Sequence, residues 1–250
     1  MILRRLTIHV KEQNWFAVAL DFVIVIFGIL IAFQITNWRE AQQDNLIYEQ
    51  ARTRVIEEAK ANLIESQNFT KRAVIYQNFA FEIFEDFASC TEDTGAKERL
   101  LRNMQPLRFI LGIDVRKDAI NLLLTSDEFF DNISPEDRTV LSIYAGTIAT
   151  SSANSKFVEN FSLTRPQLQD NPVFGRTIEG DNMRGLVALT LDVSYQQACK
   201  DKALNDLIFD RFELSNYLIV QAEHLNQASR ELLVQLGVSV PETSNREEQP

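Results

Sequence analysis

Apolar residues form one unbroken stretch near the N-terminus. Residues 16–33 read FAVALDFVIVIFGILIAF, in which Asp21 is the only ionisable side chain. Together with the next two residues, this stretch would form a helix of roughly 30 Å, the thickness of the hydrocarbon core of a bilayer. Trp15 and Trp38 bracket it, at positions where amphipathic rings prefer the membrane interface. The pattern predicts one membrane-spanning helix within residues 15–38.

Two other interpretations of this stretch fit its neighbours less well. The core helix of a soluble protein would need a polar face, which residues 22–33 lack. A cleavable signal peptide would need small residues at a cleavage site, whereas the sequence after the stretch is QITNW. We therefore expect a retained anchor.

Positive charge lies mainly before the anchor. Arg4, Arg5 and Lys11 precede it, whereas Arg39 is the one nearby cation that follows it before Arg52. An excess of positive charge marks the cytoplasmic side of a span. We therefore expect a cytoplasmic tail over residues 1–14 and a domain outside the cytoplasm. In a Gram-negative bacterium this is a single-pass inner-membrane protein with a periplasmic domain.

The rest of the chain has the periodicity of helices. Residues 39–88 contain neither proline nor glycine, and Ala51, Val55, Ala59 and Leu63 recur on one helical face. They predict a long helix that can continue from the membrane span. A second long helix is predicted over residues 195–236, ending before Gly237.

Shorter elements are expected between the two long helices. We predict a helix over residues 96–104, another over residues 116–124 capped by Asp114, and a third that begins after Ser134 with Pro135 in its first turn. Residues 164–185 are expected to form an irregular connection.

The chain has only 8 glycines and 6 prolines, which are residues that turns commonly require. A chain with few turns favours long helices, and we therefore expect an all-α fold. The expected architecture is one N-terminal transmembrane helix followed by a soluble antiparallel helical bundle over residues 39–240. Its backbone would be two long helices, with a coiled-coil-like packing. Residues 241–250 are polar and acidic and are expected to form a disordered tail.

Net charge and residue types limit the kinds of partner and reaction that this chain could have. The net charge of -10 disfavours nucleic acid as a partner, because an acidic domain repels phosphate backbones. The two histidines, His9 and His224, are too few for a zinc cluster or a histidine-based triad. Two acidic clusters remain as weak candidates for a cation site and are more typical of solvated surface; they are Glu82, Glu85 and Asp86, and Asp127, Glu128 and Asp131. We expect no catalytic residue, no metal site and no cofactor.

Cys90 and Cys199 are the only cysteines. In a domain outside the cytoplasm they could form a disulfide, and the alternative is two buried free thiols. Cys90 would end the first long helix and Cys199 would lie near the start of the last, so the two could meet at one end of a bundle.

The membrane helix carries small residues along one strip. Steps of 3.6 residues per turn place Asp21, Gly28 and Ala32 on the same side, and the spacing of Gly28 and Ala32 lets two helix backbones approach closely. This strip is the predicted contact face for a second copy or for another envelope protein. The alternative is a lone anchor whose Asp21 reaches the interface.

The end of the anchor, GILIAFQITNWRE at residues 28–40, resembles a large uncharacterised bacterial family of single-span membrane proteins. In that family an apolar helix ends in a glutamine, an Asn-Trp pair and an acidic residue. Residues 119–144 are similar to its pattern of a helix, a polar turn and a helix that ends in an aromatic residue. The resemblance covers about a sixth of the chain and implies single-span topology and helical content only.

Three classes of function fit these observations. The leading hypothesis is a non-enzymatic, membrane-tethered helical module that binds or scaffolds another envelope protein. A periplasmic hydrolytic enzyme is the second. A sensor is the third, and it would act through a partner subunit because fourteen cytoplasmic residues cannot form an output domain.

Overall fold

The computed structural model describes residues 15–108, 112–179 and 186–240. The structure is 81% helical with few strands, which agrees with the mainly helical class predicted from the sequence. The chain divides into two units, Met1–Gln50 and Ala51–Pro250. The helices are α2 (Trp15–Ser89), α3 (Ala96–Leu107), α4 (Asp118–Thr125), α5 (Pro135–Thr164), α6 (Tyr195–Lys200) and α7 (Lys202–Gln235).

The first unit contains the N-terminal part of α2. This is the one helix among the described residues that is long and apolar enough to cross a membrane, judged by length and composition alone. Its apolar 18-residue window is 0% buried, and no atom lies within 4 Å of a Cβ added at Gly28. Ala32 and Trp38 are also exposed. The side chains of Trp15 and Asp21 lie outside the described residues, as do the tails at residues 1–14 and 241–250.

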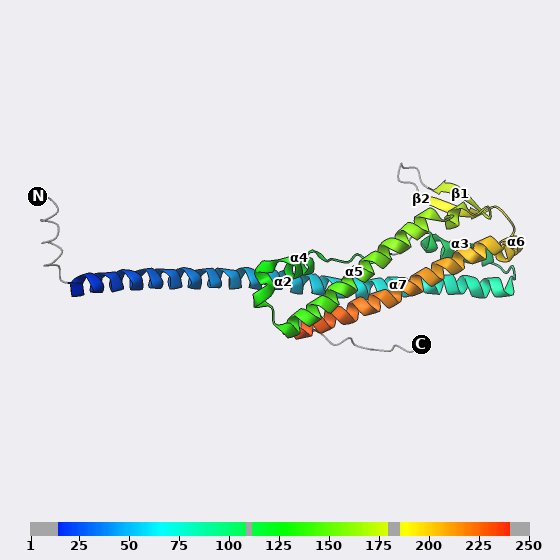
Figure 1. The fold of residues 1–250 in the computed structure, drawn as a ribbon. Coiled ribbons are helices and arrows are strands. Elements are labelled where there is room, and N and C mark those ends of the chain that lie inside the picture. The colour runs from blue at the N-terminus through cyan, green and yellow to red at the C-terminus, as the bar shows by residue number, and fades with distance from the viewer. Residues whose placement is uncertain (1–14, 109–111, 180–185, 241–250) are drawn as a thin grey trace, which may run out of the picture. The chain divides into compact units, whose positions relative to one another are not determined.

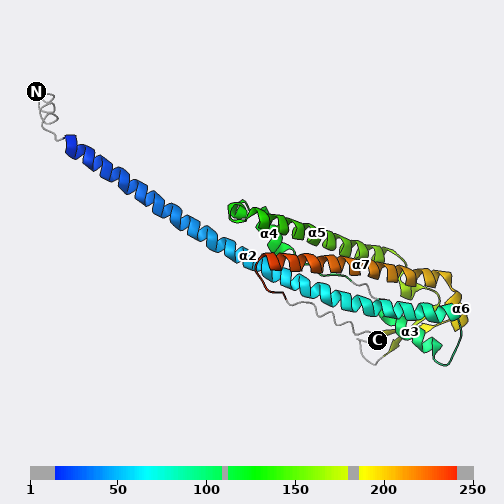
Figure 2. The ribbon, with the colours of Figure 1, turned by 90° about the horizontal axis from the view of Figure 1, so that it is seen from below.

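In the second unit, α5 and α7 pack along each other and the part of α2 after Ala51 lies beside them (Figures 1 and 2). Gln235 donates a hydrogen bond to Asp137 near the start of α5. Arg165, just after the end of α5, pairs with Asp210 of α7. The buried faces carry the apolar residues expected from the sequence, among them Val55, Ala59, Leu63, Leu218, Leu225 and Leu232.

A second apolar cluster forms around the C-terminal part of α2. Ile83 and Phe87 pack there with Leu100 and Met104 of α3 and with Tyr195 of α6. The aromatic residues near the end of α2 therefore enter a core, although Phe81 is 55% exposed.

The expectation of an irregular connection over residues 164–185 was wrong in part. Strand β1 (Phe174–Glu179) pairs with β2 (Leu186–Leu191) in an antiparallel hairpin, with Phe174 opposite Leu191. Leu189 and Leu191 alternate along β2 and are both buried in the second apolar cluster. A strand whose alternation involves so few residues gives a weak sequence signal next to prolines and glycines.

Two helix boundaries also differ from the prediction. The last long helix is two helices, α6 and α7, separated at Asp201, whose carboxylate caps α7 by accepting from the Leu204 N–H at 2.6 Å. The helix predicted over residues 96–104 continues to Leu107, with Pro106 inside its last turn, where its missing N–H removes only one bond.

The start of α5 is as predicted: the Ser134 hydroxyl accepts from the Asp137 N–H at 3.0 Å, and Pro135 is the first helical residue. By contrast, α4 begins at Asp118 rather than at residue 116, and Asp114 does not cap it. The reason lies in α2, which holds the preceding segment as described below.

Candidate functional site

Cys90 and Cys199 are bonded in the structure, with Cα atoms 5.7 Å apart. Cys90 follows the last residue of α2, and Cys199 lies in α6. The bond closes a loop with a sequence separation of 109 residues. It joins the two segments at the second apolar cluster, where Phe87 and Tyr195 also meet edge to face.

Two of the acidic residues near the end of α2, Glu82 and Asp86, are paired with nitrogen donors. Arg99 bridges Asp86 at 3.1 Å and Asp93 at 3.0 Å, and this hydrogen bonding lowers the pKa of Asp93. Glu82 accepts from the Asn103 amide at 2.8 Å. Among the described residues, no group of three or more histidine, cysteine or acidic side chains is placed to hold a metal ion.

His224 and Asp127 are the remaining sequence candidates whose side chains the structure describes. His224 is exposed on α7. Asp127 lies in a short 3-10 helix (Asp127–Asn132), and the side chains of Glu128 and Asp131 are outside the described residues. Among the described residues, the sequence candidates therefore do not form a common site.

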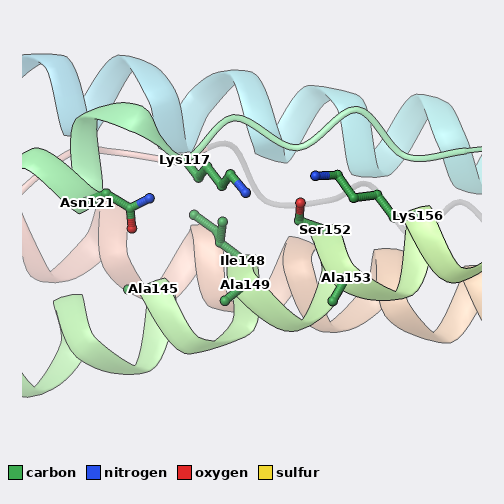
Figure 3. A pocket seen from close by; sticks show the side chains of 8 residues that line it. All are labelled: Lys117, Asn121, Ala145, Ile148, Ala149, Ser152, Ala153 and Lys156. Atoms are coloured by element: carbon green, nitrogen blue, oxygen red, sulfur yellow. The ribbon is translucent and has the colours of Figure 1, made fainter.

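A cleft of about 260 Å³ opens between α4 and α5 and was not predicted from the sequence (Figure 3). We call it the α4–α5 cleft. None of the described residues that line it is acidic. Its lining residues are Lys117, Asn121, Ala145, Ile148, Ala149, Ser152, Ala153 and Lys156.

One wall of the α4–α5 cleft is a face of α5. Ile148, Ser152 and Lys156 follow one another at intervals of four residues, which places them along the same side of the helix. Ile148 is buried, whereas Lys156 is exposed. Alanines occupy the neighbouring positions, and their small side chains leave the space that the cleft occupies.

The opposite wall is held in place by α2. The Asn62 side chain donates to the Arg116 carbonyl at 2.8 Å and accepts from the Arg116 N–H at 2.9 Å. One turn earlier, the Glu58 carboxylate accepts from the backbone N–H groups of Ala119 at 2.8 Å and Ile120 at 3.2 Å. Lys117 lies between these attachments, so its backbone is fixed on both sides.

Glu58 takes the role of a helix cap for α4. Lys117 is the residue before the helix and makes no side-chain capping bond. The first N–H groups of a helix lack partners within the helix and attract negative charge, so a carboxylate from α2 satisfies them and offsets the helix dipole. Glu58 is 7% exposed, and these bonds account for its burial.

A buried hydrogen bond connects this wall to α5. The Asn62 amide donates to the Tyr144 hydroxyl at 2.9 Å. Tyr144 is 1% exposed, and burial raises its pKa to about 12. The three elements α2, α4 and α5 are therefore joined behind the cleft by polar groups that have partners.

The amino groups of Lys117 and Lys156 face the same space. Figure 3 shows both side chains extending toward the Ser152 hydroxyl, with the Asn121 side chain beside Lys117. Within the described part of the chain, neither lysine forms a salt bridge. The arrangement gathers two cations and a hydroxyl, which are groups that can bind an anion.

Sequence reasoning missed this cleft because its two lysines are far apart in the chain and belong to no local motif. The run of alanines at intervals of four on α5 was the one visible signal. Small residues on a helix face are equally typical of close helix packing. The alanines alone therefore do not predict a binding site, and the position of Lys117 cannot be read from the sequence.

A separate surface near the end of α5 carries an exposed and a partly buried aromatic residue. Phe157 is 59% exposed, and its ring lies 5.8 Å from that of Phe161. The Arg165 guanidinium lies 4.2 Å from the centre of the Phe161 ring and also pairs with Asp210. We call Phe157, Phe161 and Arg165 the α5 aromatic surface.

No protein-family model, curated protein or solved structure matches this chain. The cleft and the aromatic surface are therefore interpreted from their own geometry.

Proposed function

We propose that this chain is a single-span envelope protein whose periplasmic domain, an antiparallel helical bundle, binds or scaffolds another protein. Its tail at residues 1–14 is cytoplasmic and residues 15–38 cross the inner membrane. The observation that carries the proposal is the complete exposure of the apolar window of α2, in a chain whose second unit has its own buried core.

The exposed apolar window of α2 is not buried by other described parts of this chain. Phe22 and Phe33 are 66% and 64% exposed, and the large apolar residues between them are exposed as well. Soluble monomers rarely leave so much contiguous apolar surface in water. Each Å² of it transferred into lipid contributes about 25 cal/mol. A bilayer covers all sides of such a helix, whereas the core helix of a soluble domain would already be mostly buried.

Two independent features support a periplasmic location for the domain. The cations Arg4, Arg5 and Lys11 precede the span, which favours a cytoplasmic N-terminus. The Cys90–Cys199 bond is of a kind that persists in oxidising compartments and is rare in the cytosol.

The α5 aromatic surface supports a binding role for the domain. Aromatic and arginine side chains are enriched among the residues that contribute most to protein interfaces. Phe157 is 59% exposed, and Arg165 lies over the Phe161 ring and also pairs with Asp210. The surface therefore has anchor residues already in position.

Topology is tested with the chain in its native membrane. We expect the protein to resist extraction at alkaline pH, and we expect periplasm-specific reporters fused at Leu63 and at the C-terminus to be active. Alkylation of unreduced cells should show Cys90 and Cys199 protected from the thiol reagent. Activity of a cytoplasm-specific reporter at both fusion points would contradict the proposed orientation.

Binding is tested by photo-crosslinking in intact cells. A photoreactive phenylalanine analogue at position 157 should give a discrete adduct with one partner protein. The same analogue at position 234, where Val234 is 65% exposed on α7, serves as the control and should give none. Equal diffuse labelling from both positions would count against a specific partner at the α5 aromatic surface.

A further inference from the structure

We propose that the α4–α5 cleft binds a phosphate group, held by the amino groups of Lys117 and Lys156 and by the Ser152 hydroxyl. This goes beyond the tethering and scaffolding function, and it holds whether or not the domain is anchored in a membrane.

The two lysines supply the charge. They come from different elements and line one cleft, and none of the lining residues that the structure describes is acidic. Like charges that share a cleft repel each other, and this repulsion is relieved when an anion lies between them. A phosphate monoester carries a charge of about −1.5 to −2 at neutral pH and can neutralise both ammonium groups, whereas a single carboxylate can neutralise only one.

The other polar groups fit the same ligand. Phosphate oxygens accept several hydrogen bonds, and the cleft offers ammonium, hydroxyl and amide donors from Lys117, Lys156, Ser152 and Asn121. The volume of about 260 Å³ lies below the roughly 300–1,000 Å³ of pockets for drug-sized ligands. It therefore suits a small anion or the phosphate end of a larger molecule.

Contacts within the protein hold the cleft in shape. Asn62 and Glu58 fix the backbone on either side of Lys117. Because Glu58 already occupies the first N–H groups of α4, the end of that helix does not provide the attraction. The lysines must provide it, and their removal gives a direct test.

The negative net charge of the whole chain makes phosphate binding a more specific test of the two lysines. With a net charge of -10, the protein repels anions at long range. Saturable phosphate binding therefore requires a local group of cations and cannot come from the general field of the protein.

The full-length chain in neutral detergent micelles is titrated with inorganic phosphate by calorimetry at pH 8 and low salt. We expect one saturable site. Lys117→Gln and Lys156→Gln should each weaken binding about ten-fold. Ala149→Leu fills the cleft without changing the charge and should weaken binding by at least as much, and Ser152→Ala should weaken it several-fold.

Lys71→Gln and Lys97→Gln are the matched controls, because each removes one exposed lysine outside the cleft. Both should bind phosphate as the wild type does. Circular dichroism and thermal midpoints confirm that each variant is folded. The proposal is overturned if no saturable site exists, if the control variants lose as much affinity as the cleft variants, or if Ala149→Leu and Ser152→Ala both bind normally.

The source of the phosphate group is distinguished in nanodiscs. The chain is reconstituted in phosphatidylcholine with or without phosphatidic acid, and the phosphate titration is repeated. Loss of phosphate binding only in the presence of phosphatidic acid identifies a lipid headgroup as the ligand. Unchanged binding in both identifies a soluble phosphate compound.

Discussion

Asn62 and Arg116 are joined by two hydrogen bonds that imitate the pairing of neighbouring strands. The Asn62 side chain bonds both the N–H and the C=O of Arg116, although the two residues are 54 positions apart. A side chain thus takes the place of a backbone partner. It fixes the segment before α4 against α2, and this in turn places Lys117 in the α4–α5 cleft.

Replacement of Asn62 by alanine should destabilise the domain by about 2–4 kcal/mol. The side chain is fully buried, and its loss removes one hydrogen bond to the Tyr144 hydroxyl and two to the Arg116 backbone. Urea unfolding followed by circular dichroism measures the change. Gln77→Ala, which removes a weak exposed contact to Asn216, should leave the midpoint nearly unchanged. A similar small change for Asn62→Ala would show that Arg116 finds other partners.

Glu58→Ala should cost about 1–3 kcal/mol of unfolding free energy, because two N–H groups at the start of α4 lose their acceptor. Glu58→Gln keeps one acceptor oxygen and should therefore lower the unfolding free energy by less than Glu58→Ala does. The neighbouring Glu57 is exposed and paired with Lys60, and Glu57→Ala is the matched control with almost no effect. Equal effects at positions 57 and 58 would rule out the capping role.

Removal of the disulfide should lower stability by about 4–5 kcal/mol, because closing so long a loop restricts the unfolded chain. The variant Cys90→Ala, Cys199→Ala should unfold at lower urea concentration than the oxidised wild type, and the wild type should approach it after reduction. If reduction leaves the wild-type midpoint unchanged, the bond contributes nothing.

Cys90 has a φ of 44°, in the left-handed region that favours glycine. The variant Cys90→Gly, Cys199→Ala should therefore be more stable than Cys90→Ala, Cys199→Ala by about 1 kcal/mol, although both lack the bridge. The comparison separates the backbone effect from that of the cross-link, and an equal midpoint for the two variants would show that residue 90 relaxes once the bridge is gone.

Tyr144 should make the domain sensitive to high pH. Its pKa rises from the ordinary 10.0 to about 12 on folding because it is buried. Below pH 10 both states hold the proton, so stability is unaffected. Between pH 10 and 12 the unfolded state loses the proton first, so stability falls as pH rises, by roughly 2 kcal/mol near the upper limit.

Urea unfolding of the wild type and of Tyr144→Phe between pH 9 and 11.5 measures this contribution. Phenylalanine does not titrate, so the variant should lose less stability over this range than the wild type. Tyr217, which is 42% exposed on α7, provides the control: Tyr217→Phe should follow the wild-type curve. Parallel curves for all three proteins would contradict the assignment to Tyr144.

Gly28→Leu should weaken self-association or partner association of the membrane helix. The position is open in the isolated chain, and a small residue there lets a second backbone approach closely. A membrane reporter assay of the helix measures the effect, with Leu30→Ile on the bulky side as the control. If Gly28→Leu and Asp21→Leu both associate as the wild type does, the strip with Ala32 faces lipid only.

Elements with strong local signals could be predicted from the sequence. The absence of proline and glycine over residues 39–88 corresponds to the continuous α2, and Ser134-Pro135 marks the start of α5. The hairpin and the break at Asp201 have weaker signals. Six-residue strands offer few alternating positions, and an aspartate inside an apolar helical pattern looks like an ordinary exposed residue until its carboxylate is seen to cap Leu204.

The α4–α5 cleft depends on contacts across the chain, and this explains why the sequence did not reveal it. Asn62 is one polar residue among many on α2, and nothing near it in the sequence shows that it will meet Arg116. The start of α4 was predicted wrongly for the same reason: its cap, Glu58, comes from another helix.

The Cys90–Cys199 bond has a mechanical consequence. Residues 91–198 form a covalently closed ring with the bridge, and the chain enters and leaves this ring through α2 and α6. When the chain is pulled taut between α2 and the end of α7, the shortest covalent path runs through the two sulfur atoms and leaves out the backbone within the ring. A protease cut at any point inside the ring likewise leaves the fragments in one piece until the bridge is reduced. The residues that line the α4–α5 cleft lie within this ring, whereas Glu58 and Asn62, which hold one of its walls, lie on α2 outside it.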